Sequence, residues 1–370
     1  MKKILFGITS LTLGGAERVL VDIANTLVDK YDITIFTIYA NGELERQLNK
    51  KVKLKSLYDS SYGELSSFQK HILMPLKILI KKNKIYQTKI KGNYEVEIAF
   101  LEGPITRLFS SKNKKTRKLA WVHNDIRQVF GKGIKARIKK KIDQKIYNQY
   151  EKIIFVSKDN LVEFKKVYPN VTKPKKVIYN YLDQERILKK AEEKVKLPFQ
   201  GENINFLTVT RLVEQKAIDR IIRVHKRLIQ NGFFHNFYVI GDGPERGKIQ
   251  RLIKENQLEN TFFLLGKKEN PYPYIKNSDC FCLLSKFEGY GMVIEEAKIL
   301  NKSILITNTA AREAVVGYKD AKIVENSEEG IYEGLRKKIE EKSSIKTESQ
   351  KYENKENLEK IINILEEKGK

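Results

Sequence analysis

The chain has few of the residues on which metal-bound and disulfide-bonded proteins depend. Its 370 residues include only two cysteines, Cys280 and Cys282, and four scattered histidines. The two cysteines lie two apart in one expected strand, so their side chains point to the same face and are expected to pack in a core. This spacing gives no tetrahedral metal site without further ligands, and no bound metal is predicted.

Sequence signatures of several nucleotide-binding and acyl-transfer enzymes are also missing. The chain has no GxxxxGK[ST] loop, no GxGxxG fingerprint, no GxSxG elbow and no DxD pair that would hold a metal-bound diphosphate. A nicotinamide cofactor is therefore not supported, and no cofactor is predicted. A diphosphate bound without a metal must be neutralised by Arg, Lys and the positive ends of helices.

The chain lacks an apolar run long enough to cross a bilayer, although 41% of its residues are hydrophobic, as in a folded protein. Its length is sufficient for two domains. The N-terminal segment MKKILFGITS is short and has no small-residue cleavage site, so it is expected to form the first strand and not a signal peptide. These features predict a cytoplasmic protein.

Acidic residues are scarce in the first half of the chain. The net charge is +25, and residues 1–182 carry +21 of it. The basic runs at 77–91, 112–118 and 132–145 mix lysine with Ile, Leu and Tyr, which predicts an anionic partner. An anionic membrane surface and nucleic acid both fit, and a merely solubilising surface is the plain alternative. No nucleic-acid-binding motif accompanies the charge, so the membrane surface is favoured and nucleic acid is not expected.

The first half alternates strands and helices. A strand at 4–9 is followed by the glycine turn Gly14, Gly15, then by a helix with apolar residues at helical spacing, then by a strand at 33–38. Residues 59–91 show no strong strand signal. The further expected strands are at 95–101, 118–122, 153–156 and 176–179. His123 ends one of them at the edge where parallel sheets bind ligands, so it has a functional interpretation beside the structural one.

The second half alternates more regularly, which predicts a parallel sheet with helices on both faces. The expected strands are at 205–209, 236–240, 261–265, 279–284, 303–307 and 321–324. The predicted fold class is α/β, with two doubly wound Rossmann-like domains. The predicted domains are 1–182 and 183–349, and a C-terminal helix at about 350–370 is expected to pack back on the first domain.

Three loops of the second half carry the candidate site. The first holds Arg211 and Lys216, two cations suited to clamp a diphosphate. The second holds Gly241 and Gly243. The third is SKFEGYGMVIEEAKIL at 285–300, where a strand, a glycine turn and a helix N-terminus together make an anion site. Its acids, Glu288 and Glu296, are good acceptors for the hydroxyls of a sugar or a ribose. An ordinary strand-turn-helix with two surface acids is the alternative.

With these motifs the chain resembles the retaining glycosyltransferases of family 4, which have two facing domains and a cleft between them, the GT-B fold. The resemblance covers nearly the whole chain. It rests on GGAERVL at 14–20, VHND at 122–125, TRLVEQK at 210–216, IGDGPER at 240–246 and the E-x7-E pattern FEGYGMVIEEA at 287–297.

The resemblance implies a role for each candidate residue. Arg211 and Lys216 would bind the donor diphosphate, Glu288 would contact the donor sugar, and Glu296 would hold the ribose. The amides of Tyr290, Gly291 and Met292 would complete the phosphate cradle, and Gly289, Gly241 and Gly243 would be further donor-binding residues. Gly14 and Gly15 would approach the phosphates or the acceptor, and His123 would face the donor sugar. One departure is the segment 309–313, TAARE, where many members have a glycine pair.

The implied activity is metal-independent transfer of a hexosyl or N-acetylhexosaminyl group, by a front-face mechanism, from a UDP- or GDP-linked sugar. The implied acceptor is a glycan, often lipid-linked, in bacterial surface polysaccharide synthesis. The enzyme is then expected to be peripheral on the inner face of the cell membrane. A sugar-nucleotide epimerase of the same fold is one alternative, and a basic nucleic-acid-binding protein is a second.

Overall fold

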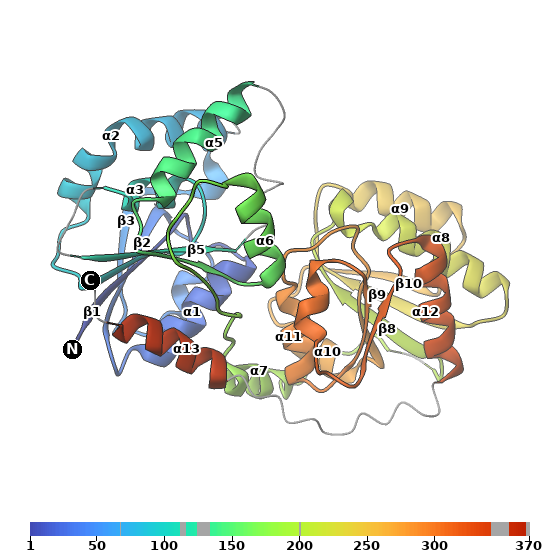
Figure 1. Cartoon of the computed structure of the whole chain (residues 1–370). Coiled ribbons are helices and arrows are strands. Elements are labelled where there is room, and N and C mark those ends of the chain that lie inside the picture. Colours follow the sequence, from blue (N-terminus) through green and yellow to red (C-terminus); the bar gives the residue numbers. More distant parts are fainter. Residues whose placement is uncertain (67, 112–115, 124–133, 200, 342–354, 368–370) are drawn as a thin grey trace. The chain divides into compact units, whose positions relative to one another are not determined.

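The computed structural model describes residues 1–66, 68–111, 116–123, 134–199, 201–341 and 355–367. The chain divides into two compact units, Met1–Asp183 with Asn354–Lys370, and Gln184–Glu353. Each unit is a parallel sheet with helices on both faces (Figure 1). Within the described residues no helix is both long enough and apolar enough to cross a membrane.

The N-terminal unit has a seven-stranded sheet of order β3-β2-β1-β4-β5-β6-β7, and all its described strand pairs are parallel. The strands are β1 Lys3–Ile8, β2 Asp32–Ala40, β3 Lys53–Ser61, β4 Val96–Ala99, β5 Arg117–Val122, β6 Lys152–Phe155 and β7 Lys175–Val177. The longer helices are α1 Gly15–Leu27, α2 Met74–Lys89, α3 Pro104–Phe109, α5 Ile134–Tyr147, α6 Lys158–Val167 and α13 Lys355–Glu366, and the π-helical turn η3 Gln69–Leu73 leads into α2.

Helices α2, α3, α5 and α6 cover one face of this sheet, and their buried side chains form one core with it. Helices α1 and α13 cover the other face (Figure 1). Helix α13 comes from the C-terminal end of the chain, and Lys2 Nζ donates to the carbonyl of Leu365 at 2.6 Å. The last helix is therefore part of the N-terminal unit.

The C-terminal unit has a six-stranded parallel sheet of order β10-β9-β8-β11-β12-β13. The strands are β8 Ile204–Val209, β9 His235–Ile240, β10 Phe262–Gly266, β11 Cys280–Leu283, β12 Ser303–Thr307 and β13 Ala321–Val324. The helices are α7 Gln184–Ala191, α8 Ile218–Gln230, α9 Arg246–Glu255, α10 Tyr272–Asn277, α11 Met292–Ile299 and α12 Glu328–Glu340, with short turns at η4 Glu214–Lys216 and η5 Ala310–Val315. Helices α8, α9 and α12 share a core with one face of the sheet.

The strand pattern expected from the sequence is confirmed with one exception. The strand β3 at the edge of the first sheet, Lys53–Ser61, is absent from the prediction, and its last residues fall in the segment 59–91 for which no strand was expected. Its sequence KLKSLYDSS is only half-buried or exposed, as an edge strand can be, so it lacks the apolar run of a central strand. Cys280 and Cys282 are buried and unoxidised, as expected for core residues.

Candidate active site at the edge of the second sheet

The order of the second sheet creates a natural ligand site between two of its strands. The chain runs outward from β8 through β9 to β10, then returns to place β11 on the opposite side of β8. The loops that follow β8 and β11 therefore leave the carboxyl edge in opposite directions. Ligands of open parallel sheets bind at such a reversal, because the diverging loops leave a crevice there.

The two loops at this reversal are bound to each other by their backbones and side chains. The amide of Lys286 donates to the carbonyl of Gln215 at 2.9 Å, and the Gln215 side-chain amide donates to the carbonyl of Phe287 at 2.8 Å. Lys286 also pairs with Glu214 at 3.2 Å. These bonds give the loops one fixed arrangement, which positions the residues that follow them.

Lys216 and Glu288, two of the residues singled out in the sequence, meet across these loops. Lys216 Nζ lies 2.5 Å from Glu288 Oε1, and the two side chains are 16% and 7% exposed. A charge-assisted bond between two mostly buried groups is stronger than a surface pair, because water screens it less. The sequence placed both residues at the same sheet edge, and the structure brings them into direct contact.

Arg211, the second cation of the expected clamp, has a different environment. Its side chain is exposed and makes no hydrogen bond or ion pair within the part of the chain that the structure describes. The structure therefore does not join Arg211 to the Lys216–Glu288 pair. It leaves an unneutralised guanidinium five residues before Lys216 on the same loop.

The glycine loop after β9 packs against the loop after β8. A Cβ at Gly241, whose φ is 141°, would lie 1.8 Å from the carbonyl oxygen of Thr210. A Cβ at Gly243 would lie 2.4 Å from that of Leu212, whose amide donates to the carbonyl of Asp242 at 3.0 Å. Both glycines thus permit close contact between the two loops. The sequence had suggested donor binding for them and not this packing role.

The turn before α11 depends on a glycine as well. Gly291 has φ 77°, a left-handed conformation, and a Cβ there would lie within 3.0–3.3 Å of Ile294, Leu283 and Ala311. Gly289 and Tyr290 precede it, and α11 begins at Met292. The positive end of the α11 dipole therefore lies in the same loop as Glu288.

Glu296 and its neighbour Glu295 have opposite environments on α11. Glu296 is half-buried, and the hydroxyl of Tyr272 on α10 donates to its Oε1 at 3.1 Å. Glu295 is 2% exposed, accepts from the hydroxyl of Tyr290 at 2.7 Å, and pairs with Lys298 at 3.1 Å. Glu295 is therefore held by protein partners, whereas part of Glu296 remains open to solvent.

Three further candidates lie in the N-terminal unit, whose sheet order reverses between β1 and β4. Gly14 precedes α1, Gly15 is its first residue, and both are exposed at the carboxyl edge of β1. His123 follows β5, and its amide donates to Glu102 Oε1 at 2.6 Å. Asn124 and Asp125, which complete the VHND motif, lie outside the described residues.

The imidazole of His123 is packed among aromatic rings. Its centroid is 4.6 Å from that of Phe100 and 6.2 Å from that of Trp121. Among the described residues its Nε2 is buried without a hydrogen-bond partner. Burial lowers the pKa of His123 to about 3, so the ring is neutral at physiological pH. It is suited to contact an uncharged part of a ligand rather than to act as a cation.

Comparison with known proteins finds similarity to glycosyltransferases. The family described as "Glycosyl transferases group 1" matches residues 189–359, which include the Lys216–Glu288 pair. A Campylobacter jejuni N-acetylgalactosaminyltransferase that acts on a diphospho-undecaprenol glycan is 26% identical over 92% of this chain and 91% of its own. An uncharacterized glycosyltransferase of Methanocaldococcus jannaschii is 25% identical over 55% of this chain, which spans about half (51%) of that relative's length.

The fold comparison extends over both units. The structure of HepE from Anabaena in complex with UDP and glucose has a TM-score of 0.73 and 17% identity, and the match covers 99% of each chain. By the family match and these relatives, the chain is a glycosyltransferase. Its two Rossmann-like sheets confirm the expected GT-B fold class.

Two structural residues of this glycosyltransferase escaped the sequence-based prediction. Arg220 on α8 is buried and donates to the carbonyl of Leu284 at 2.8 Å and to Asn326 Oδ1 at 2.9 Å, which anchors the loop after β11. Its sequence signal is a cation one helical turn before Val224, on the apolar face of α8. Tyr272, the partner of Glu296, lies in a turn-rich segment and carries no comparable signal.

Proposed function

We propose that this glycosyltransferase moves an N-acetylhexosamine from a UDP-linked donor to a lipid-linked glycan acceptor, with retention of configuration, in bacterial surface polysaccharide synthesis. The observation that carries the proposal is the Lys216–Glu288 pair at the reversal between β8 and β11. The pair places a cation that can bind a phosphate in direct contact with an acceptor for hydroxyls. A nucleotide sugar presents both groups at adjacent positions.

The residue roles follow from charge and position. Lys216 and the exposed Arg211 bind the diphosphate, Arg211 in a bidentate manner and Lys216 as a point charge. Glu288 accepts hydrogen bonds from hydroxyls of the donor sugar. Glu296, oriented by Tyr272, accepts from the ribose hydroxyls. Gly289, Tyr290, Gly291 and Met292 form the turn that presents the N-terminus of α11 to the phosphates.

The donor is inferred from the relatives. The Campylobacter enzyme is named for the transfer of N-acetylgalactosamine, and the Anabaena structure contains UDP and glucose. We infer that the nucleotide is a uridine diphosphate and that the sugar carries an N-acetyl group. A GDP-linked sugar is the alternative that a donor panel distinguishes.

The acceptor is inferred in the same way. The Campylobacter relative is named for a glycan on diphospho-undecaprenol, an anionic lipid carrier. We propose that the N-terminal unit binds such an acceptor, with Gly14 and Gly15 at the edge of the first sheet. The neutral His123 contacts the donor sugar. The enzyme then works peripherally at the inner face of the cell membrane.

The proposed reaction is a front-face displacement, as in the family 4 enzymes with an E-x7-E pattern. The bond between the anomeric carbon and the diphosphate oxygen breaks while the acceptor oxygen bonds to the same face. The acceptor proton passes to the leaving phosphate, so no protein nucleophile is required. Negative charge grows on the phosphate, and each clamp cation that stabilises it contributes about 2 to 4 kcal/mol, by comparison with oxyanion donors.

A donor panel tests the proposal. The full chain is mixed with UDP-N-acetylglucosamine, UDP-N-acetylgalactosamine, UDP-glucose or GDP-mannose and with a short-chain polyprenyl-diphosphate glycan, and nucleotide release and product linkage are measured. We expect release with a UDP-N-acetylhexosamine and an axial product linkage. An equatorial linkage would refute retention, and turnover of GDP-mannose alone would refute the donor.

The epimerase alternative makes a different prediction in the same assay. An epimerase interconverts donor sugars without an acceptor and releases no nucleotide by transfer. The environment of His123, closed in by Phe100 and Trp121, does not favour it. The absence of a nucleic-acid partner stays a prediction.

A further inference from the structure

The outer face of the helix formed by η3 and α2 is unusually apolar for a surface. Leu73, Leu76 and Ile80 are 44%, 51% and 71% exposed. Their spacing of three and four places them on one stripe, while Ile78 on the opposite side of α2 is fully buried. Ile72 and Phe68 extend the exposed apolar surface toward the start of the helix. Scattered single residues would need no explanation, but a contiguous stripe indicates a binding surface.

The charges beside this stripe all have one sign. Residues 68–91 contain no Asp or Glu, and Lys77, Lys81 and Lys84 are exposed next to the apolar side chains. Helix α5 adds exposed Arg137 and Lys141. An apolar stripe flanked by lysines is the pattern of a helix that lies in the interface of an anionic membrane.

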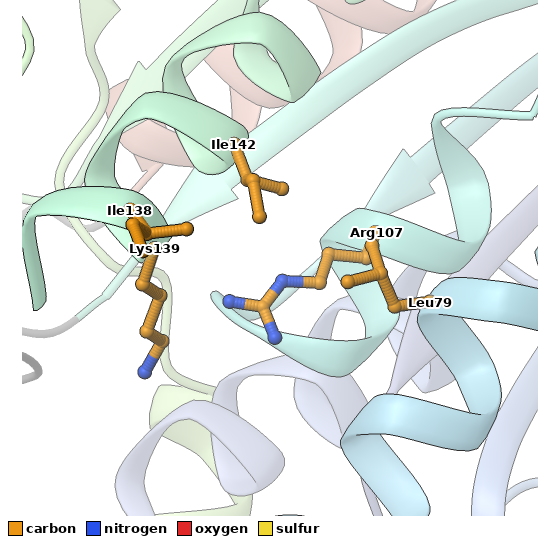
Figure 2. A pocket seen from close by; sticks show the side chains of 5 residues that line it. All are labelled: Leu79, Arg107, Ile138, Lys139 and Ile142. Carbon is orange, nitrogen blue, oxygen red and sulfur yellow. The ribbon is translucent and has the colours of Figure 1, made fainter. Parts of the chain in front are cut away.

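A pocket of about 210 Å³ lies between α2 and α5 and is lined by Leu79, Arg107, Ile138, Lys139 and Ile142. Figure 2 shows the α5 side chains on one side of the pocket and Leu79 and Arg107 on the other. Arg107 donates to Asp143 at 2.8 and 2.9 Å, and Lys139 is the second cationic side chain of the lining. The walls are apolar and the charged groups are cationic, as a lipid with an anionic head group requires.

The pocket and the stripe are continuous. Leu79 in the pocket precedes Ile80 of the stripe, and Ile138 lines the pocket while it is 54% exposed. Burial and the neighbouring Arg107 lower the pKa of Lys139, Asp143 acts in the opposite direction, and a bound anion would further stabilise the charged form of the lysine. One surface therefore combines apolar side chains, exposed lysines and a recess lined by Arg107 and Lys139.

We propose that this surface, made by residues 68–84 of η3 and α2 with Arg137, Ile138 and Lys141 of α5, docks on an anionic lipid bilayer. The apolar stripe enters the boundary between head groups and acyl chains. The lysines contact lipid phosphates, and the pocket receives one anionic head group. A second copy of the chain does not fit as the occupant, because it would bring lysines against lysines.

This docking surface is separate from the donor site, which belongs to the C-terminal unit. The inference rests on the proposed function for the peripheral location at the membrane. Docking requires no donor and no transfer, so it can fail while the transfer reaction holds, and the reverse is also true. A nucleotide-binding measurement on the same variants distinguishes the two failures.

Vesicle flotation of the full chain tests the proposal, with vesicles of phosphatidylcholine alone or mixed with phosphatidylglycerol. We expect binding only to the mixed vesicles and a steep loss with rising salt. The variant Lys77→Gln/Lys81→Gln/Lys84→Gln should bind about a hundredfold more weakly, about fivefold for each lysine. The variant Leu73→Ser/Leu76→Ser/Ile80→Ser should bind at least about tenfold more weakly.

Matched controls use equally exposed residues elsewhere. Val316→Ser with Phe234→Ser removes apolar surface, and Lys254→Gln/Lys267→Gln/Lys337→Gln removes the same charge from the C-terminal unit. Both should bind vesicles like the original chain. A control that loses as much binding as the matching surface variant would overturn the assignment, as would equal binding to neutral vesicles.

A fluorescence measurement tests insertion directly. Leu76→Cys allows selective labelling with a polarity-sensitive dye, because Cys280 and Cys282 are buried. We expect a blue shift on addition of anionic vesicles and none with neutral vesicles. An unshifted label, or a shift that needs only a higher protein concentration and no lipid, would refute membrane docking and indicate self-association.

Discussion

Exchange of Glu288 for glutamine separates the binding of phosphate from the binding of sugar. In the structure Lys216 is neutralised by Glu288 at 2.5 Å, so the carboxylate competes with any diphosphate for the same ammonium group. In Glu288→Gln the lysine keeps a hydrogen-bond acceptor of the same shape but loses the opposing charge. We therefore expect UDP to bind more tightly to this variant, whereas sugar transfer falls.

The size of the effect can be worked from the contact distance. A phosphate oxygen bound to Lys216 would lie about 5 Å from the Glu288 carboxylate, where two unit charges repel by about 0.8 kcal/mol in water and about 3 kcal/mol at the effective dielectric of a protein surface. The value in water is a lower bound, because both side chains are mostly buried and water screens them less. It corresponds to about fourfold tighter UDP binding, so we expect an increase of at least about fourfold.

Transfer should change in the opposite direction. An amide is a weaker acceptor for sugar hydroxyls than a carboxylate, and the loss of one transition-state contact typically costs about a hundredfold or more in turnover. Isothermal titration with UDP and a transfer assay on the same preparation provide the two measurements. The matched variant Lys216→Gln should lose both UDP affinity and turnover.

Two results would refute this reasoning. If Glu288→Gln bound UDP more weakly than the original chain, the carboxylate would not lie beside the phosphate site. If it retained full turnover, Glu288 would not contact the donor sugar. A fall in thermal stability alone would not explain tighter binding, so the sign of the affinity change is diagnostic.

Three further perturbations test the stability of the two folded units. His225 and His235 are fully buried and joined by a 2.7 Å bond; burial lowers the pKa of His235 to about 4 and that of His225 in the same direction. As the pH falls, protons bind the histidines of the unfolded chain first, so the stabilisation is complete above the unfolded pKa of about 6.5 and is lost toward pH 4. The expected loss in the free energy of unfolding is about 1.4 kcal/mol per histidine at pH 5.5. Urea unfolding at pH 7.5 and pH 5.5 should show this loss in the original chain and a smaller one in His225→Phe. Gly241→Ala should destabilise by about 2 to 4 kcal/mol because its Cβ would overlap the Thr210 carbonyl, whereas Gly247→Ala, with nothing within 4 Å, should be neutral in the same thermal melt. Lys118→Met should lower the free energy of unfolding by about 3 to 5 kcal/mol, because Glu97, which is 1% exposed and 3.2 Å from Lys118, would lose its cation. The double variant Lys118→Met/Glu97→Leu should recover most of this stability in urea unfolding.

The sequence predicted the strands well because most are buried parallel strands with continuous apolar runs. β1 and β11, for example, are almost entirely buried, and their composition shows it. β3 was not predicted, because an edge strand is exposed along much of its length and therefore has no continuous apolar run. Its lysines are compatible with an edge position. Periodicity reports burial, so an exposed element carries a weak signal even when its backbone is regular.

Side-chain partners in the candidate site could be predicted only in part. Glu288 and Lys216 were placed at one sheet edge by topology, but which acid pairs with which cation depends on loop bonds such as Lys286 to Gln215. Adjacent Glu295 and Glu296 look alike in the sequence. Their different environments follow from Tyr290 and Tyr272, which approach α11 from other segments. No local pattern contains that information.

The strained residue beside Lys216 indicates that the donor loop is shaped before any donor binds. Ala217 adopts φ 50°, which costs a residue with a Cβ about 1 to 2 kcal/mol, and it is completely buried. The surrounding bonds hold it there. Its amide donates to Glu214 and closes η4, and Arg220 in the first turn of α8 fixes the opposite loop by its bond to the carbonyl of Leu284. The Glu288 carboxylate accepts the charge-assisted bond of Lys216 that a donor phosphate accepts in the proposed complex. A loop that already holds its cation in place loses little conformational freedom when the diphosphate replaces the carboxylate, so the ion pair prepares the site for the ligand with which it competes.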